Sequence, residues 1–423
     1  MLSKADLTVD VDLLSEEAVR DPYPQYIWLR EYAPVHWNAR LGAWVLTEYD
    51  DVRAAFRDAR LSSDRVSPVY AKRRERDEDA TATRVGAILS RWIVFNDPPA
   101  HTRLRKLVEY AFRPRAVERM DAIVQDIVDE YVDVVVAPGA SPDEAAATRE
   151  SKHFDFVSAF AEPLPVRVIA SMLDVPTEYH APMARWSDEI VTLVFGARGV
   201  ADREQRAAEG LEAFASLVET LLAERRAHPG EDLISDLVSA QERGDTLSDD
   251  EIIATCVLLL FAGHETTRNL LANGLKVMLE DGEAWAALCQ APDRAPDAVE
   301  EVLRFDGPIK SMWRLAAEPA VYQKVEMEPG DRVLLIQSAA NRDAKRFNNP
   351  EKFLLERPAN RHVAFGYAIH YCLGAAIARL EGTLVFKALA ARVPSIKLAT
   401  QHFDYEPFIV SRTVKSLPVN VSV

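Results

Sequence analysis

The chain has 423 residues, of which 48% are hydrophobic and 27% charged, and a formal net charge of −16. This composition predicts a folded core of enzyme size, and the acidic balance argues against a general nucleic-acid binder, which carries a basic excess. Three cysteines exclude a disulfide framework and are typical of a reducing, cytoplasmic compartment. With no signal-peptide pattern and no run near the ~18 apolar residues of a membrane helix, we expect a soluble protein.

The opening third of the chain predicts a small β part mixed with helices. Residues 24–32 predict a helix, and residues 33–56 predict a hairpin, with its turn at 39–42, followed by a second helix. Residues 62–91 are polar, charged and poorly periodic, and they predict mostly loop. A helix is expected over 101–112, directly after an Asp-Pro-Pro sequence.

The middle of the chain predicts helices. Residues 115–136 are amphipathic, and helical periodicity returns over 156–173 and 201–227. Between them, residues 137–152 have the composition of a surface loop. We find neither an internal repeat nor a linker, so residues 1–423 are expected to form a single domain.

The longest predicted helix covers about residues 246–280, with Ser248 as its N-cap and acidic residues in its first turn. A helix of about 50 Å with an apolar middle must cross the core. Strands are expected over 314–343, around a Pro329-Gly330 turn, and again in the tail from residue 403. The fold class is therefore mainly α with a minor β part.

The centre of the long helix places Gly263, His264, Glu265, Thr266 and Thr267 inside an apolar run. Glycine in a helix costs ~1 kcal/mol relative to alanine, and a threonine hydroxyl can bond a carbonyl one turn back and bend the helix. A carboxylate should not be buried there without a partner. The combination favours a distorted helix that lines a cavity. A solvated break, or a contact of small residues with another helix, is the alternative.

The role of two sets of charged residues depends on their surroundings in the fold. Glu301 and Arg304 are three residues apart on one helix, a spacing that usually gives a weak surface pair. Four donors suited to carboxylate or phosphate groups come from three separate segments of the chain. They are His101, Arg105, Arg314 and His370.

Cys372 lies between Phe365-Gly366 and a helix predicted from about Leu373. A cysteine at a helix N-terminus has a lowered pKa, which favours a thiolate that can bind a metal. Three other interpretations remain: a small buried hydrophobic residue, a catalytic nucleophile with His370 as base, and a zinc ligand together with His362 and His370.

These motifs, in this order, resemble those of a soluble bacterial cytochrome P450, a haem-thiolate monooxygenase. The matching segments are DPPAHTRLRKLVEYAFRPRAV, AGHETT, EEVLR, SAANRD and FGYAIHYCLGAAIARLE. The resemblance runs from about Asp21 to the C-terminus. It implies the cytochrome P450 fold, with haem b between the long central helix and the helix after the cysteine, and O2 as co-substrate.

Carried over residue by residue, the resemblance implies that Cys372 is the axial thiolate ligand of the haem iron, a ligand that favours O–O cleavage. Glu265 and Thr266 would be an acid–alcohol pair that delivers protons during oxygen activation, and Gly263 would leave room for dioxygen. The haem propionates would be contacted by His101, Arg105, Arg314 and His370. A buried charge network would consist of Glu301, Arg304 and Arg357. Other positions implied at the haem are Ala262, Phe365, Gly366 and Gly374.

One position departs from the family pattern, which has glycine four residues before the cysteine. Here that residue is Ala368. An alanine in the left-handed conformation costs roughly 1–2 kcal/mol, so either the turn is rearranged or the strain is tolerated.

The substrate is expected to be a hydrophobic organic molecule that is hydroxylated or epoxidised. Its candidate contacts are mostly apolar, as in most ligand pockets, and plain core packing is the alternative for each. They are Trp92, Ile93, Val94, Leu259, Ala262, Ile309, Met312 and Phe408. Lys310 and His264 are polar exceptions suited to an anionic or hydroxylated substrate.

The resemblance also implies a ferredoxin and its reductase as electron donors to a protein that we expect to be monomeric. We propose a basic patch that steers the ferredoxin, made of Arg113, Arg115, Arg361 and Arg379, although scattered surface arginines would look the same. Two other classes compete with the monooxygenase. They are a haem-thiolate enzyme that uses peroxide or rearranges its substrate, and a non-enzymatic haem sensor.

Overall fold

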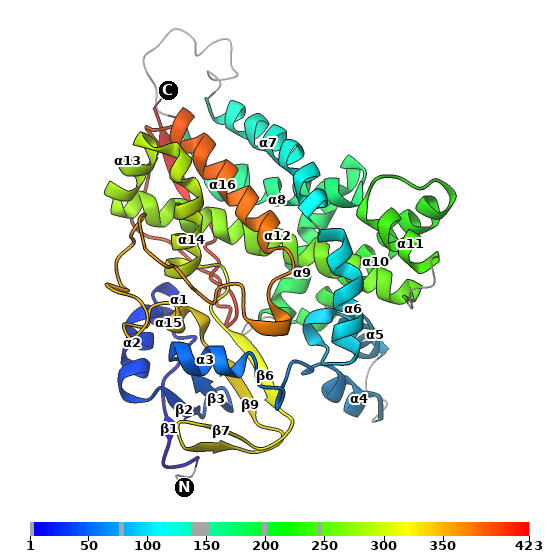
Figure 1. The fold of residues 1–423 in the computed structure, drawn as a ribbon, viewed down its shortest axis with the longest axis vertical. Helices are drawn as coiled ribbons and strands as arrows, with labels where there is room; N and C mark the ends of the chain where they lie inside the picture. The colour runs from blue at the N-terminus through cyan, green and yellow to red at the C-terminus, as the bar shows by residue number, and fades with distance from the viewer. Residues whose placement is uncertain are drawn as a thin grey trace.

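The computed structural model describes residues 4–75, 80–112, 114–136, 152–196, 201–242 and 247–422. Figure 1 shows a β-rich part built from the N-terminal segments and the yellow strands, and a larger helical part that packs on it. The expected fold class, mainly α with a minor β part, is confirmed. Among the residues of these ranges, no helix combines the length and the apolar character needed to cross a membrane.

The helices are α1 (Glu16–Arg20), α2 (Tyr23–Tyr32), α3 (Tyr49–Ala55), α4 (Ser67–Glu75), α5 (Ala80–Leu89), α6 (Ala100–Val108), α7 (Pro114–Val136), α8 (Pro163–Leu173), α9 (His180–Val194), α10 (Arg203–Ala227), α11 (Leu233–Glu242), α12 (Asp249–Asp281), α13 (Glu283–Gln290), α14 (Ala295–Asp306), α15 (Gln337–Ala340) and α16 (Ala375–Arg392). The strands are β1 (Thr8–Val9), β2 (Val35–Asn38), β3 (Ala43–Leu46), β4 (Leu61–Ser62), β5 (Lys152–Asp155), β6 (Met312–Ala316), β7 (Ala320–Tyr322), β8 (Val325–Met327), β9 (Arg332–Leu335), β10 (Lys397–Leu398) and β11 (Pro418–Val421).

The main sheet has the strand order β1-β2-β3-β9-β6-β4. β2 and β3 form the predicted hairpin, in which Trp37 pairs with Trp44 and Gly42 takes a positive φ of 58° in the turn. β9 pairs in parallel with β3, although nearly 300 residues separate them along the chain. The sheet therefore joins the N-terminal segments to the segment that follows α14.

The helix α12 is the axis of the helical part. Its start is the predicted one, because the Ser248 side chain accepts a hydrogen bond from the Glu251 N–H while the Glu251 side chain bonds back to the Ser248 N–H. The helix contacts α8, α9, α10, α14 and α16, and most of its residues from Ile252 to Met278 are buried. This burial explains how a helix of 33 residues is stable with few charged residues in its middle.

Two segments differ from the prediction. Residues 62–91 are mostly helical rather than loop, because they form α4 and α5. Gly86, which in sequence looks like a helix breaker, lets α5 approach Tyr70 of α4 so closely that a Cβ there would collide with the ring. Lys152, at the end of the predicted surface loop, begins β5, which pairs with β11. The rest of that loop, residues 137–151, lies outside the described residues.

Candidate active site

The segment that carries Cys372 is a compact loop between a short 3-10 helix, Ala368–His370, and α16. The Cys372 N–H donates to the Phe365 carbonyl oxygen at 2.9 Å, which closes the loop. Two positive φ angles turn the chain, 71° at Gly366 and 59° at Ala368. The alanine therefore takes the left-handed conformation itself, and the turn is not rearranged to avoid it.

The thiol of Cys372 is half-buried, and two opposing effects act on it. Burial raises its pKa, whereas a hydrogen bond from the Gly374 backbone and the charges of Arg105 and Arg379 lower it. Burial outweighs the others, so the pKa is raised, contrary to the lowering expected from the helix N-terminus alone. A thiolate at this position thus needs a further cation, and a coordinated metal ion supplies one.

The four predicted donors come together beside this loop. The rings of His101, from α6, and His370 lie with their centroids 4.3 Å apart. Arg105 donates to the Tyr371 carbonyl oxygen at 2.7 Å, next to the cysteine. Arg314, from β6, is buried at 4% exposure. Helix α6, strand β6 and the cysteine loop therefore present cationic or neutral donors to one place.

A fifth residue, Arg65, completes this donor cluster, and no sequence pattern predicted it. Burial, Arg314 and Arg332 lower the pKa of Arg65 to about 9. Burial and the charges of Arg314, His101, Arg105 and Arg65 lower the pKa of His370 to about 3. Because Arg65 lies in the charged stretch predicted as loop, its spacing could not distinguish it from the surface arginines around it.

The centre of α12 has the bend-forming contact that its sequence predicts. The Thr266 hydroxyl donates to the Ala262 carbonyl oxygen at 2.7 Å, one turn back. The neighbouring Glu265 is buried at 3% exposure and accepts hydrogen bonds from Asn269 at 3.0 Å and Thr413 at 3.1 Å. Burial is the largest influence on the Glu265 carboxyl and raises its pKa, although these partners and the charge of Arg268 oppose it.

A chain of charged groups leads from Glu265 toward the surface. Arg268 lies 3.9 Å from the Glu265 carboxylate and 3.8 Å from that of Glu162, which is one-third exposed. Burial and the nearby charges of Glu265 and Glu162 raise the pKa of Asp188, on α9, to about 7. Asp188 can therefore gain or lose a proton near neutral pH, and its charge interacts with that of the buried Glu265 carboxylate.

Gly263 faces a different neighbour from the one expected. A Cβ built there would lie 3.4 Å from the Cδ1 atom of Ile169 in α8, an ordinary packing distance. The missing side chain therefore points toward α8. Whether the position also leaves room for dioxygen stays a prediction.

Most of the apolar substrate candidates gather in one cluster. Trp92 and Phe408 are buried within it, and Ile93, Val94, Leu259, Ala262 and Ile309 are partly buried against it. Met312 is the exception, since it packs against the separate cluster around Trp44 and Leu335. Aromatic rings contact one another in this cluster. The centroid of the Phe261 ring lies 5.5 Å from that of Trp92 and 5.6 Å from that of Phe195.

Glu301 and Arg304 are fully buried rather than a surface pair. Arg304 holds both carboxylate oxygens of Glu301 at 2.7 and 2.8 Å, and Arg357 adds contacts at 2.9 and 3.0 Å. The remaining donors of Arg304 reach the carbonyl oxygens of Asn341, Pro350 and Lys352. This network ties α14 to the segment that leads into the cysteine loop.

Comparison with known proteins identifies the family. A family model described as Cytochrome P450 matches residues 198–392. The "Polyketide biosynthesis cytochrome P450 PksS" of Bacillus subtilis (strain 168) is 34% identical, over 96% of this chain and 97% of its own length. The chain belongs to the cytochrome P450 family. The "6-deoxyerythronolide B hydroxylase" of Saccharopolyspora erythraea is 35% identical, over 98% of this chain and all of its own length.

The fold agrees with solved cytochrome P450 structures. The structure of P450BioI in complex with an acyl carrier protein that carries hexadec-9Z-enoic acid matches with a TM-score of 0.85 at 29% identity, covering 96% of this chain and 99% of that one. This protein is therefore a cytochrome P450 monooxygenase, an oxidoreductase of a family that uses haem b and O2.

The residues present fit a haem. Nη1 of Arg65 and Nδ1 of His101 are buried and have no hydrogen-bond partner among the described residues. Within the same part of the chain, no carboxylate forms an ion pair with Arg65 or Arg314. Asp97, whose charge acts on Arg314, is already bound by the Ser62 hydroxyl and by the Ser63 N–H. A group with two carboxylates, such as the haem propionates, is what this donor set lacks.

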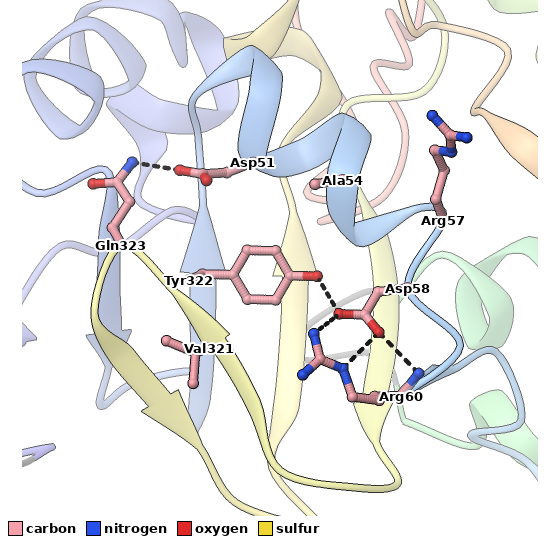
Figure 2. Close-up of a pocket in the computed structure, with 8 residues that line it drawn as sticks. All are labelled: Asp51, Ala54, Arg57, Asp58, Arg60, Val321, Tyr322 and Gln323. Carbon is pink, nitrogen blue, oxygen red and sulfur yellow. Dashed lines mark hydrogen bonds and ion pairs between the residues drawn. The ribbon is translucent and has the colours of Figure 1, made fainter.

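The described residues do not support the alternative zinc site of His362, His370 and Cys372, and the surface cavity in Figure 2 does not involve the donor cluster. His362 bonds to Glu300 at 3.2 Å, and the described residues contain no group of three potential ligands close enough to hold a metal ion. The cavity, of about 490 Å³, opens between α3 and β7, and no predicted site residue lines it. Figure 2 shows Tyr322 and Arg60 both bonded to Asp58 at its wall.

Proposed function

We propose that this cytochrome P450 inserts one oxygen atom of O2 into an apolar organic substrate, by hydroxylation or epoxidation, with electrons from a ferredoxin and its reductase. The observation that supports this most is the donor cluster beside the cysteine loop. Arg105 in this cluster pairs with Glu109, but among the described residues no carboxylate forms an ion pair with Arg65 or Arg314. The "6-deoxyerythronolide B hydroxylase" and the polyketide enzyme PksS, by their names, point to polyketides as one substrate class.

Each residue of the cluster has its own part in holding the cofactor. Cys372 is the thiolate ligand, and the Gly374 backbone N–H and the charges of Arg105 and Arg379 favour its ionised form. His101, Arg105, Arg314 and His370 bind the propionates, and we add Arg65 to them. The bound haem supplies the activation of dioxygen, and its thiolate ligand increases the electron density that this step requires.

Glu265 and Thr266 deliver the protons that oxygen activation requires. Thr266 donates its own hydroxyl hydrogen to the Ala262 carbonyl, so its oxygen is free to accept a hydrogen bond from the cavity side. Glu265 is held away from solvent by Asn269 and Thr413, and Arg268 connects it with Glu162. We infer that protons enter through Glu162 and Asp188, reach Glu265 and are positioned by Thr266.

The acid–alcohol pair also separates the competing functions. A haem-thiolate enzyme that uses peroxide, or that rearranges its substrate, does not need this route for protons, and a haem sensor does not need it either. In those proteins the buried Glu265 would destabilise the fold without contributing to function. The monooxygenase therefore explains the most residues.

The electron donor is expected to bind on the side of the cysteine loop. Arg361 is exposed there, whereas Arg379 is engaged with Glu300 at 2.5 Å. Arg113 lies outside the described residues, as does the side chain of Arg115. Steering of an acidic ferredoxin by the exposed arginines predicts that the reduction rate falls steeply with ionic strength. A reduction rate independent of salt would contradict this part of the proposal.

The test of the proposal is the visible spectrum of the purified protein, reduced and exposed to carbon monoxide. Thiolate ligation gives a strongly red-shifted Soret band, which Cys372→Ser should remove. Cys289→Ser, at another half-buried cysteine, is the matched control and should leave the band unchanged. Protein that binds no haem, or a band that survives Cys372→Ser, would overturn the assignment of the ligand.

A further inference from the structure

Lys310 occupies a fixed position between α14 and β6. Its N–H donates to the Val410 carbonyl oxygen at 2.7 Å, and its own carbonyl oxygen accepts from the Ser338 N–H at 3.1 Å. The preceding residue, Ile309, forms a β-bridge with Ser411. The N–H and the carbonyl oxygen of Lys310 are thus both hydrogen-bonded, which fixes the position of its Cα atom.

Lys310 is a buried lysine whose charge is not balanced by an ion pair within the part of the chain that the structure describes. The residue is 2% exposed, and among the residues that the structure describes no acceptor or carboxylate pairs with its Nζ. Asp306 is the nearby acid, but its carboxylate is bound by the Tyr23 hydroxyl at 2.6 Å and by Arg412 at 3.3 Å. Burial and the charge of Arg412 lower the pKa of Lys310 to about 7, against a smaller effect of Asp306.

The residues next to Lys310 along the chain and across its backbone hydrogen bond belong to the apolar cluster of the substrate candidates. Ile309 and Val410, which flank Lys310 along the chain and across the backbone bond, are both in that cluster, together with Leu259, Ala262 and Phe408. A hydrophobic side chain would pack there without the cost of removing a charge from water. A lysine at this place is therefore explained best by a ligand that brings the missing negative charge.

The position also suits a substrate that extends toward the cofactor. Lys310 and Arg314 are four residues apart on the segment that becomes β6. At ~3.3 Å per residue of extended chain, their Cα atoms are at most about 13 Å apart. A ligand held by Lys310 would thus have its apolar body among the cluster residues, with the donor cluster near one end of the same segment.

We propose that Lys310 binds the anionic group, a carboxylate or a phosphate monoester, of an otherwise apolar substrate. The inference rests on the proposed function, because it assigns a substrate class to the same proposed active site. Lys310 is a binding residue that fixes which carbon of the substrate is presented for oxidation. It does not take part in proton delivery.

The test uses probes whose binding does not depend on knowing the substrate. Alkyl chains of six, nine and twelve carbons carry an imidazole at one end, which ligates haem iron and shifts the Soret band. The other end is a carboxylate, a phosphate or an alcohol. In the wild-type holoprotein we expect at least one chain length at which an anionic probe binds tenfold or more tightly than the alcohol. The anionic probe with the larger gain in affinity over the alcohol shows whether the site prefers a carboxylate or a phosphate.

The variants then assign the preference to one residue. Lys310→Met should bring the dissociation constants of anion and alcohol within threefold of each other, while Lys310→Arg keeps the preference. Lys324→Met, at an exposed lysine in the turn before β8, is the matched control and should behave as wild type. If Lys310→Met does not fold, Lys310→Gln replaces it, and the wild-type comparison needs no variant.

Two results would overturn the inference. One is equal affinity for anionic and alcohol probes at every chain length in the wild type, and the other is an anion preference that survives Lys310→Met and Lys310→Gln. Failure of the proposed function looks different, because a protein without haem gives no imidazole-induced Soret shift with any probe. A shift with every probe but no preference for the anion would leave the haem assignment intact and remove only the role of Lys310.

Discussion

Burial and the neighbouring guanidinium of Arg314 are the two largest influences that lower the pKa of Arg65, to about 9. The two arginines thus repel each other in a place where no carboxylate of the described chain pairs with either. In the protein without haem this repulsion opposes folding, and in the proposed holoprotein the propionates would relieve it. The same pair therefore has opposite effects on the two forms.

Arg65→Met should separate these effects. We expect the free energy of unfolding of the apoprotein to rise by about 1 kcal/mol, because a buried charge without a partner is removed. Haem should dissociate tenfold or more faster, measured by transfer to apomyoglobin. Arg84→Met removes an exposed arginine that pairs with Glu212 and should change neither quantity. An apoprotein destabilised by Arg65→Met would show that the arginine has a partner in the chain itself.

Thr266→Ala tests the route for protons. The variant loses the hydroxyl that bonds to Ala262 but keeps the helical backbone. We expect electron input to continue while the product formed per electron pair falls tenfold or more, with the electrons recovered as hydrogen peroxide. Thr266→Ser retains the hydroxyl and should remain within about threefold of wild type. Unchanged coupling in Thr266→Ala would favour an enzyme that does not deliver protons through this residue.

The sequence predicted the elements whose patterns are strong and local. The long helix, its cap at Ser248 and the hairpin turn at Gly42 depend on neighbours along the chain, and the structure has them as predicted. The helices α4 and α5 were missed because residues 62–91 are polar, charged and poorly periodic, and the close packing of Gly86 against Tyr70 is not visible in the sequence. Fold and family were thus accessible from motifs, whereas packing between distant segments was not.

The candidate site followed the same division. Cys372 and Glu265 stand out locally, since each is a polar residue in an unfavourable place. Arg65 and the counter-ion deficit of Lys310 became visible only in three dimensions, because they are defined by the lack of an ion pair with any carboxylate of the described residues. The sign of the Cys372 pKa shift was wrong for the same reason, since the helix N-terminus is local but burial depends on the whole fold.

Glu381 predicts an unusual pH dependence of stability. One carboxylate oxygen of this residue on α16 is buried and unpaired, and burial raises the pKa of Glu381 to about 8. The folded state therefore holds a proton that the unfolded chain, with a pKa of about 4.3, releases. The contribution of Glu381 to the free energy of unfolding is therefore greatest below about pH 4.3 and is lost as the pH rises toward 8.

Glu381→Gln should remove this loss, because glutamine keeps the shape without the charge. We expect the variant and wild type to unfold at similar urea concentrations at pH 5, and the variant to be more stable by about 2 kcal/mol at pH 8. Glu300→Gln is the control of opposite sign. Burial raises the pKa of Glu300, but hydrogen bonds from His362 and Arg379 outweigh it and lower the pKa to about 2. That carboxylate stabilises the fold above about pH 4.3, so Glu300→Gln should cost about 1 kcal/mol at pH 8 and less as the pH falls.

Ala368→Gly tests the strain in the cysteine loop. The alanine has a φ of 59°, a conformation that costs an L-residue roughly 1–2 kcal/mol and costs glycine almost nothing. Glycine also makes the unfolded chain more flexible, which offsets about 0.5–1 kcal/mol of the gain. The net expectation is a holoprotein more stable by about 0.5–1 kcal/mol in urea unfolding.

The control for this variant lies in the same loop. Ala364 does not have a positive φ, so Ala364→Gly adds the flexibility without relieving strain and should destabilise by about 1 kcal/mol. The Ala368 carbonyl accepts the Tyr371 N–H at 3.1 Å, and Tyr371 directly precedes the proposed ligand Cys372, so the reduction potential is measured in parallel. A loss of stability in Ala368→Gly equal to that of Ala364→Gly would mean that the alanine is not strained, and that the family's glycine is unnecessary in this chain.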